Sequence, residues 1–113
     1  MKRKNLRFES GFHVVLGNAG SQAAEMVLPS GDAEGDPENR HAGADQWLYV
    51  VSGTGMAMVN GERYQLGQHS LMLIEHGDEH EIRNTGNDPL RTLNFYVPPA
   101  YTSDGEELPC GQD

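Results

Sequence analysis

Five histidines, at positions 13, 41, 69, 76 and 80, are the side chains of this sequence best suited to holding a metal ion. His41 and His80 differ from the others because each lies where a polar loop meets a strand-forming segment. Two neutral imidazoles from neighbouring strands, completed by oxygen ligands, can share a divalent ion. A lone histidine is more often hydrogen-bonded or exposed, which suits His13. The residues alone leave both interpretations open.

Oxygen donors lie near both histidines in the sequence. The amide oxygen of Gln46 can coordinate a metal weakly or accept a hydrogen bond from a substrate. Glu75 and Glu79 flank the turn before His80, where they are either available carboxylates or exposed turn charges. Nucleophilic catalysis has little support, because the one cysteine, Cys110, is in a polar tail and no Gly-x-Ser-x-Gly motif occurs.

The elements that must position these side chains are β-strands. Apolar residues do not recur with helical spacing, and turn residues arrive about every 8–12 residues, which is typical of an all-β barrel or sandwich. Asn60-Gly61 between two β-favouring runs is a strong hairpin signal. The polar segment 30–40 is expected to be a loop. We expect β-favouring runs or strands at 6–9, 12–16, 23–28, 46–52, 56–60, 62–66, 70–74, 80–83 and 90–97.

Several predicted strands are apolar on both faces. In QWLYVV, strand alternation places Gln46, Leu48 and Val50 on one face, and three apolar or aromatic residues on the other. If one face fills the barrel, a second sheet or a second subunit must cover the other, and we expect a homodimer. The residues expected to form the apolar pocket lining are Leu48, Met56, Met58, Leu71, Leu73 and Phe95.

Length and composition argue against several classes of function. A chain of 113 residues suits one domain. A formal charge of −9 argues against nucleic acid as a partner. No apolar run approaches the roughly 20 residues that span a bilayer, and no signal-peptide core follows Met1, so we expect no membrane partner and a cytoplasmic location. One cysteine excludes a disulfide framework and a cysteine-rich zinc site.

The sequence from about residue 24 to 98 resembles the small single-domain cupins. The first cupin motif is Gly-x5-His-x-His-x4-Glu-x6-Gly; here Asn39 and His41 occupy the two histidine positions, Gln46 the glutamate and Gly53 the last glycine. The second motif is Gly-x5-Pro-x-Gly-x2-His-x3-Asn. It is matched by His69, Glu75, Gly77, His80 and Asn84, with His69 in place of the first glycine and Glu75 in place of the proline.

The resemblance implies an antiparallel double-sheet, jelly-roll-like barrel of six to eight strands, commonly dimeric. It would make residues 1–113 one domain, with the barrel over about 12–98 and a tail over 99–113 that is draped on the surface or disordered. Family members bind a metal through three histidines and a glutamate in the barrel mouth. This sequence keeps two of those four residues, His41 and His80.

The resemblance assigns His41, Gln46, His80 and, more weakly, Asn39 to a divalent-metal site. Exchanging a carboxylate and an imidazole for amides should lower metal affinity and leave an ion more positive, although zinc, nickel, copper or iron could still bind. Glu75 and His76 are the candidates for restoring the missing donor. The motif has a glycine, which permits a positive φ, where this sequence has His69. Because His69 is not glycine, we expect the turn to shift to Gly67.

Three functions fit the sequence. The first is a metal-dependent enzyme, such as an oxygenase or isomerase, acting on a small organic substrate. The second is a non-catalytic module that binds or senses a small molecule without a tightly held metal. The third is a barrel that only supports a dimer.

Overall fold

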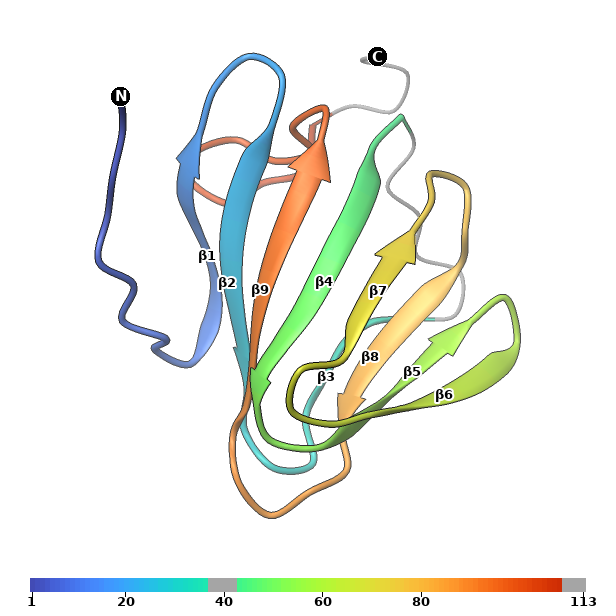
Figure 1. Ribbon diagram of the computed structural model, residues 1–113. Coiled ribbons are helices and arrows are strands. Elements are labelled where there is room, and N and C mark those ends of the chain that lie inside the picture. The colour runs from blue at the N-terminus through green and yellow to red at the C-terminus, as the bar shows by residue number, and fades with distance from the viewer. Residues whose placement is uncertain (37–42, 109–113) are drawn as a thin grey trace.

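A computed structural model describes residues 1–36 and 43–108 and shows nine strands in two antiparallel sheets (Figure 1). The nine exceed the six to eight expected from the resemblance. In chain order they are β1 Gly11–Gly17, β2 Gln22–Leu28, β3 Ala33–Asp36, β4 Asp45–Ser52, β5 Gly55–Val59, β6 Glu62–Leu66, β7 Leu71–Ile74, β8 His80–Asn84 and β9 Leu90–Val97. Within the described ranges there is no helix long and apolar enough to cross a membrane.

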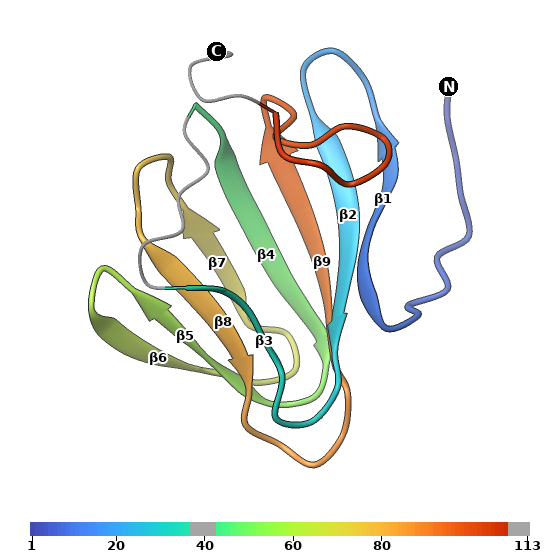
Figure 2. The same cartoon turned by 180° about the vertical axis from the view of Figure 1, so that it is seen from behind.

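The larger sheet has the strand order β1-β2-β9-β4-β7, and the smaller has the order β3-β8-β5-β6. Every paired strand is antiparallel, so the predicted all-β double-sheet barrel is confirmed. The two sheets face each other and converge at the lower end in the view of Figure 2. Apolar side chains from both sheets fill the space between them: Met26, Leu28, Leu48, Val50, Ala57, Leu66, Ile74, Ile82 and Leu90.

Strand alternation correctly groups Gln46, Leu48 and Val50 on one face of β4, and the structure shows that this face is the inward one. Gln46, Leu48 and Val50 are all buried, whereas Trp47, one residue out of phase, is exposed. Side chains at alternate strand positions point to opposite faces, so fixing one inward residue fixes the others.

The predicted apolar pocket lining is wrong for most of its members. Leu48 is in the core, but Leu71, Leu73 and Phe95 are 62%, 43% and 40% exposed, because they occupy the outward phase of β7 and β9. Met56 and Met58 are only half-buried, and Ala57 between them is the core residue. The two methionines line a groove with Arg63, Glu81, Arg83 and Thr85.

The structure also corrects two predictions at the ends of the barrel. Part of the segment expected to be a loop, 33–36, is strand β3 and pairs with β8. Its polar sequence fits a short edge strand, since an edge strand needs little apolar surface. The run at 6–9 is not a strand. In the tail, residues 101–107 form a turn closed by a bridge between Tyr101 and Glu107, so this part is draped on the barrel.

Turn residues fix the register of the smaller sheet. Asn60 and Gly61 both have positive φ, 51° and 81°, as a two-residue hairpin between β5 and β6 requires.

Two further residues hold the connections between the sheets. Gly53 has φ +97°, and a Cβ there would lie 2.6 Å from the carbonyl oxygen of Pro89. Asn84 is buried, and its side chain holds the loop after β8 through Leu28 O, Asp88 O and Gly86 N.

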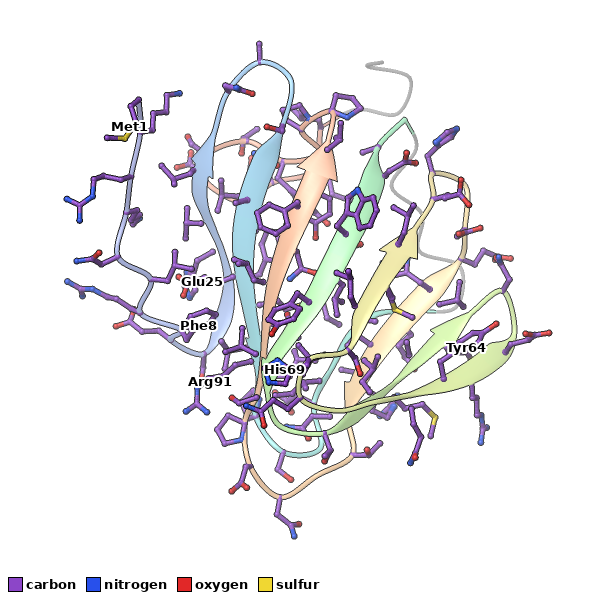
Figure 3. The ribbon with its side chains drawn as sticks, in the orientation of Figure 1. Met1, Phe8, Glu25, Tyr64, His69 and Arg91 are labelled. Carbon is purple, nitrogen blue, oxygen red and sulfur yellow. The ribbon has the colours of Figure 1, made fainter. Side chains whose placement is uncertain are left out.

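His69 itself adopts the left-handed conformation, with φ 74°. The expected shift of the turn to Gly67 is therefore wrong. A hydrogen bond joins the His69 ring to the hydroxyl of Tyr49 on β4 (His69 is labelled in Figure 3).

Candidate functional site

A cavity of about 280 Å³ opens at the end of the barrel where β4 and β8 begin and β9 ends. Strands of both sheets contribute to its wall, and the segment after β9 forms part of its rim. Among the described residues its lining is Phe12, Met26, Glu34, Gln46, His80, Ile82, Tyr96, Tyr101, Asp104, Gly105 and Glu107. Met26, Ile82 and Tyr96 are buried together with the polar side chains of Gln46 and His80, whereas the carboxylates are exposed. A charged rim therefore surrounds a floor that is apolar except for one amide and one imidazole.

The orientation of the Gln46 amide follows from a chain of three buried hydrogen bonds. The Thr92 hydroxyl donates to the carbonyl oxygen of Met26 at 2.8 Å, and a carbonyl can only accept. Thr92 Oγ1 must therefore accept from Nδ2 of Asn94, at 3.0 Å. This places Oδ1 of Asn94 against Nε2 of Gln46, at 2.8 Å. The Gln46 amide accordingly donates toward the sheet through its nitrogen.

The other polar atom of the Gln46 side chain is the amide oxygen, Oε1, which can accept a hydrogen bond. Gln46 lines the cavity and is only 2% exposed, yet its Oε1 makes no hydrogen bond to the described residues. A buried polar atom without a partner costs about 1–3 kcal/mol, and such atoms in native proteins call for an explanation. A hydrogen-bond donor or a cation in the cavity would satisfy this oxygen.

The structure brings Gln46 and His80 together as lining residues of one cavity, from opposite sheets. His80 is 4% exposed. His41 and Asn39 lie outside the described residues, and so does Cys110. Within the described part of the chain, no three His, Cys, Asp or Glu side chains form a group that could hold a metal ion.

The other donors considered for the metal site do not line this cavity. Glu75 is exposed, and the His76 ring lies 2.9 Å from Oδ1 of Asp45 in an exposed ion pair. The backbone N–H of His76 donates to the same oxygen at 2.9 Å. These hydrogen bonds, the backbone one first, hold the pKa of Asp45 below its ordinary value of 3.8. His69 bonds to Tyr49 and is also absent from the cavity lining.

The turn at 101–107 is fastened to β2 by one glutamine side chain. Oε1 of Gln22 accepts from the backbone N–H groups of Ala100 and Tyr101, at 3.3 and 3.1 Å, and its Nε2 donates to Tyr101 O at 2.7 Å. In Figure 2 this turn crosses the inner side of β2 and β9. Asp104, Gly105 and Glu107 thereby reach the rim.

Three aromatic rings pack together on one side of the cavity. The Tyr101 ring lies 4.7 Å from that of Phe12 and 5.0 Å from that of Tyr96, between ring centroids. Burial raises the pKa of both tyrosine hydroxyls, and the neighbouring carboxylates of Glu34 and Glu107 raise it further. Both hydroxyls are therefore neutral at physiological pH.

The described lining contains three carboxylates, on Glu34, Asp104 and Glu107, and neither lysine nor arginine. Sequence reasoning missed all three. Glu34 was hidden because its strand was expected to be a loop, and the other two because they belong to the tail. Tyr96 was also missed, although its inward phase follows from alternation on β9 once Thr92 and Asn94 are known to face inward.

Comparison with known proteins agrees with this architecture. The chain is 34% identical over 62 residues to the tetracenomycin polyketide synthase protein TcmJ of Streptomyces glaucescens, covering 55% of this chain and 41% of that protein. It is 30% identical over 74 residues to an oxalate-binding protein of Thermotoga maritima, covering 66% and 60%. The chain thus spans less than two thirds of the length of these relatives.

Solved structures show the same fold. A predicted oxalate decarboxylase from Thermotoga maritima has a TM-score of 0.70 and 26% identity, with 78% of this chain and 79% of that chain covered. Residues 16–96, most of the chain, match the Cupin domain family. The double-sheet barrel and this match together establish that the chain belongs to the cupin family.

Proposed function

We propose that this protein binds a small polar organic molecule in the cavity at the barrel mouth. The observation that carries the proposal is the Gln46 amide, whose nitrogen is held by Asn94 while its buried oxygen makes no hydrogen bond to the described residues. The cavity volume of about 280 Å³ lies near the lower end of the range found for small-molecule sites. Its lining combines apolar side chains with a few buried polar groups, as small-molecule sites do.

A metal-dependent enzyme, such as an oxygenase or isomerase, is the second candidate. It is favoured by one observation, that Gln46 and His80 line the same cavity. An imidazole and an amide oxygen suit zinc, nickel, iron or copper only as part of a larger set, which His41 and Asn39 would complete. A bound ion would supply Lewis-acid polarisation of a ligand oxygen. Gln46 and His80 would orient the ion, and the apolar floor would exclude water.

A ligand screen in metal-free buffer tests the first candidate. Small acids, sugars and amines are added to protein treated with a chelator, and the unfolding temperature is measured. A ligand that binds only the folded state must raise this temperature. The shift should disappear in Gln46→Leu, compared with that variant's own ligand-free value, and persist in Gln65→Leu, whose glutamine is exposed on β6. No shift with any compound would contradict the proposal.

Elemental analysis tests the second candidate. Protein purified without chelator from cells supplied with different metals should carry one ion per chain if His41, Gln46, His80 and Asn39 form a site. His41→Ala and His80→Ala should each lose it, whereas His13→Ala, at an exposed histidine, should not. A metal-free wild type under every supply would rule this candidate out.

We also propose that the protein is a homodimer that buries the outer face of the larger sheet. Phe95, Trp47 and Leu73 lie directly opposite one another on β9, β4 and β7 and form an exposed apolar row. Leu71 and Val97 extend it. A second copy of the chain is a suitable partner, because an apolar patch packed on its own copy brings no like charges together despite the net charge of −9.

A further inference from the structure

We propose that the barrel-mouth cavity selects a small organic cation, with an ammonium group held among the carboxylates of Glu34, Asp104 and Glu107 and the oxygen of Gln46. This inference rests on the proposed function, that the cavity binds a small organic molecule, and names the class of that molecule. It follows from three features of the described lining: its charge, its hydrogen-bonding polarity and its aromatic wall.

The charge of the described lining is negative. Its three carboxylates come from two separate segments, Glu34 from β3 and Asp104 and Glu107 from the turn at 101–107. The carboxylates of Glu34 and Glu107 both contribute to the raised pKa of the Tyr96 and Tyr101 hydroxyls, which line the same cavity. No lysine or arginine in the described lining offsets them. A cleft lined by one sign of charge concentrates ligands of the opposite sign.

The hydrogen-bonding polarity points the same way. The Thr92–Asn94–Gln46 chain turns the Gln46 nitrogen into the sheet, so this buried side chain meets the cavity as an acceptor. Carboxylates are acceptors as well. To satisfy these oxygens a ligand must supply donors, and a protonated amine supplies N–H donors together with the complementary charge. A dicarboxylate would supply neither.

Aromatic rings also line the cavity. Phe12, Tyr96 and Tyr101 line the same cavity, and cations are attracted to the negative faces of such rings. The tyrosine hydroxyls stay neutral and add no charge of their own. Aromatic rings combined with carboxylates favour a cation over a neutral polyol, which has donors but no charge.

Three probes of nearly equal shape separate charge from size. Dimethylbutylamine, which is protonated near neutral pH, is the cation, dimethylbutanol its neutral isostere and dimethylbutyrate its anionic counterpart. Each is titrated calorimetrically into full-length protein in chelator-containing buffer near neutral pH, at low and high salt. We expect dimethylbutylamine to bind more tightly than both other probes, with an affinity that falls as salt rises.

Carboxylate variants test which residues of the cavity bind the cation. Glu34→Gln, Asp104→Asn and Glu107→Gln should each weaken dimethylbutylamine binding about two- to fivefold, as expected for exposed charges. Glu75→Gln makes the same change in net charge at an exposed position away from the cavity and should leave binding unchanged. Ligand-free unfolding curves of each variant confirm that it is folded.

Three outcomes would overturn the inference. Equal or tighter binding of dimethylbutanol or dimethylbutyrate would show that the cavity does not select a cation, while the proposed ligand-binding function would stand. Dimethylbutylamine binding that is unaffected in all three carboxylate variants would show that the ligand binds elsewhere. If neither these probes nor any compound of the wider screen binds, the proposed function fails together with this inference.

Discussion

The side-chain nitrogen of Gln46 donates to Oδ1 of Asn94 at 2.8 Å, and the rest of the hydrogen-bond chain fixes this oxygen, an acceptor, as the group of Asn94 that faces Gln46. Position 46 is where the cupin motif has a glutamate. A carboxylate at this position would face the Asn94 oxygen, acceptor against acceptor. The amide at position 46 and the buried pair Asn94 and Thr92 are therefore chemically matched.

Gln46→Glu should consequently destabilise the metal-free protein by about 2 kcal/mol or more near neutral pH. Burial without a cation raises the pKa of the introduced carboxyl in the folded state. The protonated acid can donate to Asn94, so the penalty is smallest below about pH 4.3, the unfolded value, and grows as pH rises toward the raised folded value. Denaturant unfolding across pH measures this. An equal penalty in Gln65→Glu, or one independent of pH, would contradict the explanation.

The exposed Asp45–His76 pair gives a pH dependence of the opposite sign. Hydrogen bonds from His76 lower the folded pKa of Asp45, so the pair stabilises the fold above pH 3.8, and this contribution is lost as pH falls through the lowered value. Asp45→Asn should be less stable than wild type near neutral pH, with a difference that narrows in acid. Asp88→Asn, at an exposed carboxylate, serves as the control.

The positive φ at position 69 predicts different stabilities for the glycine and alanine variants. His69→Gly and His69→Ala both remove the ring that bonds Tyr49, but only glycine adopts φ 74° without strain. The glycine variant should be more stable than the alanine variant by about 1 kcal/mol. Thermal unfolding of the pair checks this, and equal stabilities would show that the turn rearranges on substitution.

The aromatic contacts of Tyr101 should stabilise the turn at 101–107. Tyr101→Ala removes a half-buried ring packed on Phe12 and Tyr96 and should cost about 2 kcal/mol. Tyr64→Ala removes the same side chain from an exposed position on β6, at the edge of the smaller sheet, and should cost well under 1 kcal/mol (Tyr64 is labelled in Figure 3). Equal losses would mean that the turn contributes little to stability.

The proposed homodimer predicts that a charge introduced on the outer face of the larger sheet disrupts dimerisation, whereas one on the smaller sheet does not. Leu73→Asp and Phe95→Asp place a charge in the apolar row and should halve the mass measured by light scattering. Tyr64→Asp, on an equally exposed aromatic residue outside that row, should leave the dimer intact. A wild type that is monomeric at every concentration would remove this proposal.

Local patterns predicted the parts of the fold that local physics decides. Alternation grouped the residues of each face of β4, and Asn60-Gly61 gave the hairpin, because strand pleat and turn conformation depend on neighbouring residues. The inward phase of β7 could not be predicted, since both of its faces are apolar. On β9 the pattern misleads, because polar Thr92 and Asn94 are buried while Phe95 is exposed. Strand β3 was missed because an edge strand carries little apolar signal.

The candidate site was only partly predictable for the same reason. Gln46 and His80 were found because the cupin motif marks their positions, and both line the cavity. The residues assigned from the same motif at 39 and 41 lie outside the described residues. Tyr101 carries no signal in the sequence, because an aromatic residue in a polar tail gains meaning only from the Gln22 contacts that fold the tail back.

Five of the eleven described lining residues, Phe12, Tyr101, Asp104, Gly105 and Glu107, lie outside residues 16–96, the part that matches the cupin family. The barrel and the ligand preference can therefore evolve separately. Substitutions in the chain ends can change which molecule the cavity accepts while the core between the sheets stays intact. Two cupins with closely similar barrels can thus differ in their ligands, and exchanging residues 99–108 between them is a direct route to exchanging specificity.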